Sequence, residues 1–159
     1  MIYLRLDERL LHGQVTTTWI RYLGISHIII CDDEVVNDKN QCNLLKMSVP
    51  DGVKMVIKSV DKTTSMLNDE RCKNIKILVI CANLENVMKL VENCKEIKDV
   101  NLANYGFQSD MHSKTNIMLT SNLSVNEEER EIVKKLIANK DLDVYCQVLA
   151  NQTRKIINV

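Results

Sequence analysis

The sequence predicts a three-layer α/β/α fold, in which helices cover both faces of a mainly parallel central sheet of about six or seven strands. Short β-branched runs alternate almost strictly with longer stretches of helical periodicity. The central runs, of which 75–82 is the clearest, are apolar at successive positions, as in strands buried on both faces. No repeat, linker or low-complexity stretch interrupts this alternation, so we expect one domain over residues 1–159.

The first half of the chain alternates three predicted strands with three predicted helices. Gly24 can take the left-handed conformation that ends a helix, and Asn37 or Asp38 can cap the next one. The run Pro50-Asp51-Gly52 favours a turn before the third strand. These signals place strands at 2–6, 27–31 and 53–57, and helices at 13–23, 38–48 and 62–68.

The second half continues the alternation around a polar loop at 104–114. Asn83 can cap a helix whose apolar residues share one face. Ser124 and Glu127 have the spacing of a capping box for a helix that runs to about Ala138. Strands are expected at 75–82, 100–103, 115–120 and 142–148, followed by a short C-terminal piece that can be helical.

The charge balance and the apolar pattern exclude several classes of function. Lys plus Arg and Asp plus Glu number 21 each, so the formal net charge is zero, which argues against a nucleic-acid partner. No apolar run approaches the roughly 20 residues needed to span a bilayer, and Arg5 comes before any signal-peptide core. We therefore expect a cytoplasmic protein that can serve membrane transport only through partner proteins.

The cysteines and acidic residues show no metal pattern. None of the six cysteines has a partner at Cys-x-x-Cys spacing, and no histidine stands near a cysteine pair. Asp32 and Asp33 could form a metal site or an acid pair. The simpler interpretation is a turn that shapes the edge of a pocket or meets basic residues of a partner. We expect reduced thiols, no metal and no cofactor.

The first loop concentrates side chains that suit an anion. His12 lies between a buried strand and the first helix, whose start offers unpaired N–H donors and a partial positive charge. Gly13 lets the backbone approach a bound group closely, and Arg5 and Arg9 can supply guanidinium forks that match phosphate. Asp7 can orient an arginine or hold one imidazole nitrogen, which leaves the other nitrogen as a nucleophile.

The residue pattern alone leaves another interpretation open. A lone histidine is weak evidence, so His12 could simply pack while the arginines are solvated. The first strand is followed by neither a Gly-x-Gly-x-x-Gly motif nor a Walker A lysine motif. An anion site in this loop would therefore not be an ordinary nucleotide cradle.

The same loop resembles that of a known family. Residues 5–15, Arg-Leu-Asp-Glu-Arg-Leu-Leu-His-Gly-Gln-Val, resemble the active loop of the mannose/fructose/sorbose-type IIB component of the bacterial phosphoenolpyruvate-dependent sugar phosphotransferase system. The motif is long and specific, and the resemblance extends over the whole chain. It includes Trp19 in the first helix, 31–35 after the second strand, 44–53 before the third strand, and 124–127 near the late helix.

The resemblance implies a reaction and the residues that perform it. A IIA protein or domain would donate a phosphoryl group to His12, which would pass the group to a sugar held by membrane IIC and IID components. The phosphoryl group would be bound by Arg9, Gly13 and Gln14, and the loop would be braced by Asp7 and Arg5. Neither metal nor nucleotide is required, because the donor is already an activated phosphoramidate. The protein would associate peripherally with its membrane partners, while homo-oligomerisation and the identity of the sugar stay open.

One departure from the family and two further histidines lie outside this motif. After the fifth strand the family often has a Gly-rich turn, whereas this chain has Ala103-Asn104-Tyr105-Gly106, which should lie near the His12 loop. His112, in the polar loop at the same rim, could contact a phosphoryl group, a partner or only solvent. His27 opens a strand and is expected to be structural or half-exposed.

Two other functions also fit the sequence. In the first, His12 is phosphorylated, but a regulator reads its state and no sugar is modified. In the second, an unrelated ligand-binding domain holds a static anion with Arg5, Arg9 and the helix N-terminus. Acceptance of a phosphoryl group by His12 would exclude the second function, and neighbouring IIC and IID genes would argue against the first.

Overall fold

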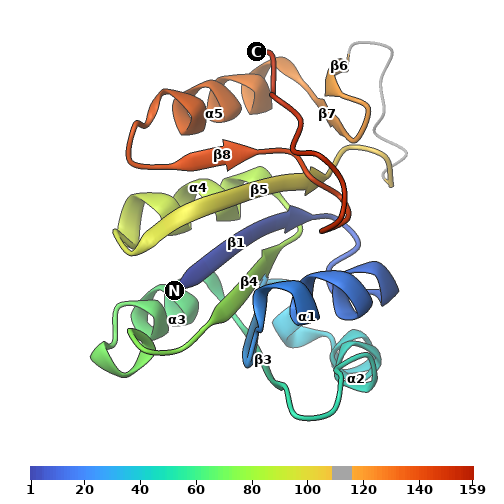
Figure 1. Ribbon diagram of the computed structural model, residues 1–159, viewed down its shortest axis with the longest axis vertical. Helices are drawn as coiled ribbons and strands as arrows, with labels where there is room; N and C mark the ends of the chain where they lie inside the picture. The colour runs from blue at the N-terminus through green and yellow to red at the C-terminus, as the bar shows by residue number, and fades with distance from the viewer. Residues whose placement is uncertain (109–115) are drawn as a thin grey trace.

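The computed structural model describes residues 1–108 and 116–159, and it confirms the predicted α/β class (Figure 1). In this part of the chain the main sheet has six strands in the order β3-β2-β4-β1-β5-β8, and every pairing in it is parallel. The strands are β1 (Ile2–Asp7), β2 (His27–Cys31), β3 (Lys54–Lys58), β4 (Ile77–Cys81), β5 (Ile97–Asn104) and β8 (Asp143–Tyr145).

Helices cover both faces of the sheet. The helix from 13 to 23 and α2 pack on one face, and α3, α4 and α5 pack on the other, so each face has its own hydrophobic cluster. Figure 1 shows α1 and α4 on opposite sides of the sheet. The α-helices are α1 (Ile20–Leu23), α2 (Lys39–Met47), α3 (Val60–Leu67), α4 (Leu84–Asn93) and α5 (Glu127–Ala138), with short 3-10 helices at Val35–Asn37 and Glu70–Cys72.

Strand β1 differs from β2 and β4 in the character of its two faces. Apart from His27, successive residues of β2 and β4 are apolar and pack alternately into the two clusters. In β1, Leu4 and Leu6 pack on the α4 side. Arg5 and Asp7 alternate with them and therefore face the helix that carries Trp19. Both charged side chains are buried, so they must find partners inside the protein.

The first helix runs from 13 to 23 as predicted, but its middle, Val15–Trp19, is a π-helical turn. Three consecutive threonines donate side-chain hydrogen bonds to the carbonyls of Gly13 and Gln14, with O···O distances of 2.6 to 3.0 Å. Such bonds compete with the regular helical ladder and favour local rearrangement of a helix. Gly24, with φ of 65°, ends the helix in the expected left-handed conformation.

The predicted strand at 115–120 requires a correction. Ile117–Thr120 (β6) does not join the main sheet, but pairs antiparallel with Leu123–Val125 (β7) in a separate two-stranded sheet. Only two residues separate these strands, 121 and 122. So short a connection permits an antiparallel hairpin, whereas a parallel crossover needs a dozen residues or more.

The helix after this hairpin begins later than predicted, with a different capping residue. Ser124 lies in β7, so it cannot cap the helix. Asn126 caps α5 instead: its side chain accepts a hydrogen bond from the Glu129 N–H at 2.8 Å, while the Glu129 carboxylate accepts one from the Asn126 N–H at 2.9 Å. This is the reciprocal bonding of a capping box, with asparagine in place of serine. Asp38 and Asn83 cap α2 and α4 as predicted.

The end of the chain also differs from the prediction. The last strand is confined to β8 and is shorter than the expected 142–148. The C-terminal piece is not helical, because Cys146 and Lys155 exchange backbone hydrogen bonds in an antiparallel bridge. Residues 147 and 148, between β8 and this returning segment, are thus left outside the regular ladder.

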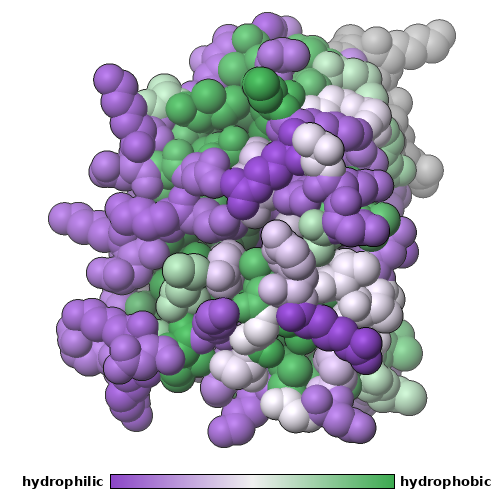
Figure 2. All heavy atoms as spheres, in the orientation of Figure 1, coloured by the Kyte–Doolittle hydropathy of each residue, from purple (hydrophilic) through white to green (hydrophobic). Residues whose placement is uncertain are grey.

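The remaining surface is mixed in character. Figure 2 shows hydrophilic side chains over much of the visible face, with apolar atoms between them. This mixture is normal, since apolar atoms supply a large share of any folded protein's surface. Among the described residues, no helix is both long and apolar enough to cross a lipid bilayer.

Candidate functional site

The loop that follows β1 lies where the connections of the sheet diverge. After β1 the chain crosses to β2 with its helix on one face, whereas the connections after β4 and β5 run over the other face. Strand β1 pairs with both β4 and β5, so its loop borders a topological switch point of the sheet. In open α/β sheets, ligands bind in the crevice at such a point, outside the carboxyl ends of the strands.

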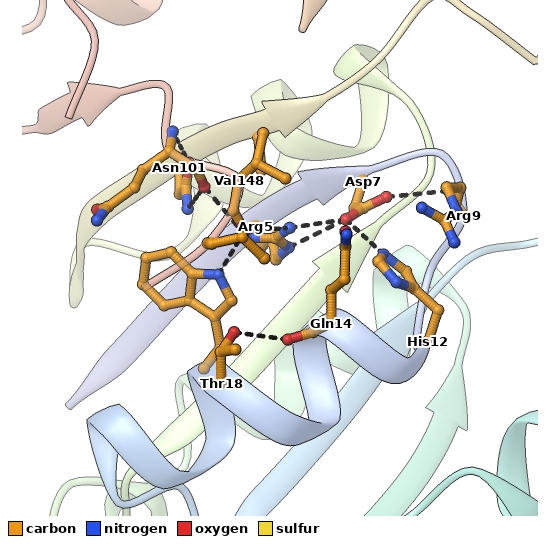
Figure 3. Close-up of polar contacts among 12 residues, drawn as sticks. Arg5, Asp7, Arg9, His12, Gln14, Thr18, Asn101 and Val148 are labelled. Atoms are coloured by element: carbon orange, nitrogen blue, oxygen red, sulfur yellow. Dashed lines mark hydrogen bonds and ion pairs between the residues drawn. The ribbon is translucent and has the colours of Figure 1, made fainter. Parts of the chain in front are cut away.

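Asp7 is the centre of the polar contacts in this loop (Figure 3). One carboxylate oxygen, Oδ2, accepts hydrogen bonds from Arg5 Nη2 at 2.8 Å and from His12 Nε2 at 3.0 Å. The other, Oδ1, accepts from the backbone N–H of Arg9 at 3.2 Å. Burial raises the pKa of Asp7, but the hydrogen bonds from His12 and Arg5 and the Arg5 charge outweigh burial, so the pKa is lowered overall. Asp7 is therefore an ionised carboxylate inside the protein.

Arg5 supports Asp7 from beneath the loop. Its side chain is almost completely buried, and the guanidinium also donates to the carbonyls of Gln147 and Val148, at 3.4 and 3.3 Å. Burial lowers the pKa of Arg5 and Asp7 raises it, but a guanidinium keeps its charge in either case. The pair Arg5–Asp7 is thus a buried ion pair whose charges compensate each other.

The sequence did not reveal the groups that hold Arg5 in place. The Trp19 indole donates to the Val148 carbonyl at 2.7 Å, and its ring lies 5.4 Å from the Arg5 guanidinium carbon. The Asn101 side-chain amide donates to the Gln147 carbonyl at 2.8 Å and accepts from the Gln147 N–H at 2.9 Å. Residues 147 and 148 lie 142 and 143 positions from Arg5, so no local motif could have indicated these contacts.

His12 has one hydrogen-bonded ring nitrogen and one without a partner among the described residues. A carboxylate can only accept a hydrogen bond, so the contact to Asp7 places a proton on His12 Nε2. The other nitrogen, Nδ1, has no hydrogen-bond partner among the described residues, although the side chain is only 12% exposed. In the neutral ring this nitrogen carries a lone pair. His12 is therefore held in the orientation and tautomer of a nucleophile.

Three further residues of the predicted site flank His12 in the same segment of the chain. Arg9, Gly13 and Gln14 are all exposed. In the part of the chain that the structure describes, the Arg9 guanidinium has neither a hydrogen bond nor an ion pair of its own. Gly13 has open space where a Cβ atom would lie. The first backbone N–H groups of the helix have no acceptor within the helix, so this rim offers donors to an incoming anion.

The turn at 103–106 lies against the His12 loop, as expected from the sequence. Glu8 joins the two segments: its N–H donates to the Asn104 carbonyl at 3.0 Å, and its carboxylate accepts from the N–H groups of Gly106 and Phe107 at 3.0 and 2.9 Å. Gly106 has φ of 90°, and a Cβ there would lie 2.0 Å from the Ser124 carbonyl oxygen. One glycine therefore suffices for this turn, because only position 106 lacks room for a side chain.

The loop itself contains a residue in an unfavourable conformation. Leu10 has φ of 56°, which a non-glycine residue seldom adopts. Its N–H donates to the Asp7 carbonyl at 2.9 Å, closing a tight turn. Leu10 and Leu11 are both buried in the cluster around Trp19. Burial of these two leucines therefore anchors the loop and stabilises the strained turn that brings His12 to Asp7.

The other candidate residues lie elsewhere or have structural roles. His27 is at the amino end of β2, the opposite edge of the sheet, where its ring bonds to Ser26. Asp32 accepts the N–H groups of the turn after β2, and Asp33 accepts the Val60 N–H, which confirms the turn interpretation. His112 lies outside the described residues. Within the described ranges, no three acidic, cysteine or histidine side chains gather to hold a metal ion.

Comparison with known proteins identifies the family. A family model for the sorbose subfamily IIB component of the phosphotransferase system, PTS, matches residues 1–157. The chain belongs to this family. A probable phosphotransferase enzyme IIB component of Streptococcus pyogenes is 31% identical over 151 residues, which cover 95% of this chain and 93% of that protein. The mannose-specific EIIAB component of Escherichia coli K12 is 33% identical over 84% of this chain, which corresponds to 40% of that longer protein.

Solved structures of PTS IIB components have the same fold. The N-acetylgalactosamine-specific IIB component 1 of Escherichia coli is 28% identical, with a TM-score of 0.86 over 99% of this chain and all of that one. The IIBSor domain of the sorbose permease of Klebsiella pneumoniae, 24% identical, has a TM-score of 0.85 over 98% of this chain and 92% of that one. This chain is accordingly a IIB component that transfers phosphoryl groups in sugar uptake, the leading function that the sequence predicted.

Proposed function

We propose that His12 is the residue of this IIB component that carries the phosphoryl group. The observation that supports the proposal best is the hydrogen bond of 3.0 Å between His12 Nε2 and Asp7, combined with the unpartnered Nδ1. An imidazole that is fixed through one nitrogen and has no partner at the other suits nucleophilic attack on phosphorus. Arg9, Gly13 and Gln14, which are exposed, flank His12 in the same segment of the chain.

The transfer can be written from these groups. His12 Nδ1 attacks the phosphorus of a phosphohistidine on the donor, and the electrons of the broken P–N bond return to the donor's ring nitrogen. The His12 ring becomes positively charged as the new bond forms, and the buried Asp7 carboxylate stabilises this charge through Nε2–H. In the second step a sugar hydroxyl attacks the phosphorus and its proton leaves to a base or to solvent. The bond between phosphorus and His12 Nδ1 breaks, its electrons return to Nδ1, and the ring becomes neutral again.

The remaining site residues would bind the phosphoryl group or support Asp7. The Arg9 guanidinium and the backbone N–H groups at Gly13 and Gln14 would bind the phosphoryl oxygens, on which negative charge is spread during transfer. Arg5 keeps Asp7 ionised and in place from below. A phosphoramidate donor is already activated, so the proposed steps use neither metal nor nucleotide, and positioning supplies most of the catalysis.

The proposed partners follow from this chemistry. A IIA protein or domain would donate the phosphoryl group, and membrane IIC and IID components would hold the accepting sugar. We place the reaction in the cytoplasm at the membrane surface. The His12 loop must then meet a donor and an acceptor in turn, so both complexes are expected to be transient. We also propose that residues 1–159 act as one domain.

Phosphoryl acceptance tests the role of His12 directly. The protein is mixed with phosphoenolpyruvate labelled with ³²P, the general phosphotransferase proteins and a mannose-type IIA, and acid-labile label is measured. We expect label on the wild type and on His27→Ala, and none on His12→Ala, which should still fold because Arg5 remains paired with the Asp7 carboxylate. Label that persists in His12→Ala but disappears in His112→Ala would contradict the proposal. The proposal would also be contradicted if the IIA donor were labelled but passed no label to the wild-type protein.

A further inference from the structure

A second polar site lies beside the His12 loop and has no role in the transfer described above. It is a pocket of about 360 Å³ at the carboxyl edge of the sheet, and Glu8 of the His12 loop forms part of its wall. The first residues after β4 and β5, Ala82 and Tyr105, line it too, so it occupies the switch point between the diverging connections. Crevices at this position commonly bind ligands in α/β folds.

The described lining of the pocket is negatively charged. Glu8 and Glu129 both line it, and the described lining contains no lysine, arginine or histidine. The Glu129 carboxylate accepts from the Tyr105 hydroxyl at 2.5 Å and from the Asn126 N–H at 2.9 Å. Burial and the nearby Glu129 raise the pKa of Tyr105, so its hydroxyl stays protonated and adds no further charge. Each carboxylate oxygen has a second lone pair available for a ligand.

Ser124 adds a hydroxyl without a protein partner to the described lining of the pocket. The residue is only 4% exposed and lines the pocket. Its N–H is bonded to the Tyr105 carbonyl, but in the described part of the chain its hydroxyl has no hydrogen-bond partner. Although the residue is nearly buried, its hydroxyl is accessible from the pocket. A ligand with hydrogen-bond donors would satisfy Ser124 together with the two carboxylates.

We infer that this pocket receives the guanidinium of an arginine side chain from a protein docked over the His12 loop. A guanidinium has a fixed positive charge and five donors, which match two carboxylates and a hydroxyl better than an ammonium or a neutral sugar does. The choice of a docked protein rests on the proposed function, in which a phosphorylated donor must cover His12. Arg9, exposed on the same loop, gives this surface adjacent positive and negative regions, which favour one orientation of the partner.

Binding of a small guanidinium compound tests the pocket without any partner. The probe is the N-acetyl, N-methylamide derivative of arginine, titrated into ¹⁵N-labelled protein, with the citrulline derivative as a neutral isostere. We expect saturable shifts of the Gly106, Ser124 and Glu129 amide signals with the arginine probe only, and weaker binding at higher salt. Equal shifts with citrulline, shifts with glucose instead, or no shift at all would overturn the inference.

One substitution removes one of the two negative charges of the pocket with little change in shape. Glutamine in Glu129→Gln can complete the capping box by accepting from the Asn126 N–H through its carbonyl oxygen, while its amide N–H can donate to the Tyr105 hydroxyl oxygen. Glu128→Gln is the matched control, because Glu128 has the same charge in the same helical turn but does not line the pocket. We expect about fivefold weaker binding of the arginine probe to Glu129→Gln, as for a partly exposed ion pair, and unchanged binding to Glu128→Gln. Equal affinities for the two variants would contradict the inference.

The same pair of variants separates this inference from the proposed function. With a phosphorylated IIA as donor, Glu129→Gln should raise KM several-fold, and the effect should exceed any change in kcat. Glu128→Gln should match the wild type. A wild-type protein that accepts no phosphoryl group would contradict the role of His12, yet the titration with the arginine probe would still decide the nature of the pocket. Normal transfer with an unchanged KM in Glu129→Gln would contradict the docking role alone.

Discussion

At the scale of single residues, Asp7 connects the stability of the site to its chemistry. Its carboxylate bonds to the buried Arg5 on one side and to His12 on the other. The ion pair with Arg5 keeps the carboxylate charged, and the charge in turn fixes the His12 ring. Removing the charge of Asp7 would leave the Arg5 guanidinium buried without its counter-charge, which is among the most destabilising changes available in a protein interior.

The substitution Asp7→Asn should therefore affect folding and transfer together. We expect the free energy of unfolding to fall by about 3 kcal/mol, as when a buried ion pair loses one partner, and phosphoryl acceptance to slow by about 100-fold or more. Denaturant titration and the rate of labelling measure the two effects. Asp143→Asn, which breaks an exposed pair with Arg154, should cost less than about 1 kcal/mol. Similar losses in both variants would contradict the account of Asp7.

The pH dependence of stability should also reveal the contribution of the ionised Asp7 carboxylate. Because hydrogen bonds from His12 and Arg5 lower the pKa of Asp7 against the effect of burial, ionised Asp7 stabilises the folded state above its unfolded pKa of about 3.9. This contribution is lost as the pH falls through the folded pKa. We expect the difference in unfolding free energy between wild type and Asp7→Asn to be constant above about pH 5 and to shrink below about pH 4. A difference that grows in acid would be inconsistent with an ionised Asp7.

Arg9 is expected to contribute through the shape of its side chain as well as its charge. In Arg9→Lys the charge remains, but an ammonium cannot bind two phosphoryl oxygens in a fork. Labelling of His12 should slow by about tenfold, which corresponds to roughly 1.4 kcal/mol in the transition state. The control Arg71→Lys changes an exposed arginine paired with Asp69, far along the chain, and should leave labelling unchanged. Equal labelling rates for wild type and Arg9→Lys would contradict the proposed binding of the phosphoryl group by Arg9.

At the scale of elements, the His12 loop is held from two sides. The helix that follows it anchors Leu10 and Leu11 in one hydrophobic cluster. On the other side, the Glu8 carboxylate binds two N–H groups of the turn after β5. The loop therefore has a defined shape although it lies at the edge of the sheet. That shape depends on Gly106, where the backbone of β7 passes within contact distance.

A pair of glycine substitutions separates crowding from backbone conformation. Gly106 and Gly52 both have positive φ, 90° and 81°, but a Cβ would clash with Ser124 only at Gly106. We expect Gly52→Ala to lower the free energy of unfolding by about 1 kcal/mol, because alanine disfavours this φ. Gly106→Ala should lower it by more than about 2 kcal/mol and should also slow labelling of His12. Thermal or denaturant unfolding would measure both, and equal losses would show that the close contact has no importance.

The elements also show which sequence signals can be interpreted locally. Asp38, Asn83 and Gly24 were recognised because caps depend on neighbours a few residues away. The capping box of α5 was placed too early, because Ser124 has the right spacing but lies in a strand. The π-helical turn was not predicted, since its threonine bonds to Gly13 and Gln14 carbonyls are a choice among several local alternatives.

At the scale of the whole molecule, the topology brings distant segments to the His12 loop. The alternation of strands and helices was enough to predict parallel layers, but it does not determine that β1 lies between β4 and β5. That placement brings Asn101 and the carbonyls of 147 and 148 beneath Arg5. The candidate site residues were predictable because they lie in one short segment, 5–15. Their supports could not be found, since they depend on the order of strands.

The central claim is that His12 carries the phosphoryl group on Nδ1. The most direct test is the nuclear magnetic resonance of the phosphorylated protein, labelled with ¹⁵N in its histidines and phosphorylated through phosphoenolpyruvate, the general proteins and a IIA donor. The account predicts a phosphorus–nitrogen coupling at His12 Nδ1, with a proton still on Nε2 and bonded to Asp7. Phosphorus on Nε2 of His12, or on another histidine, would contradict the account.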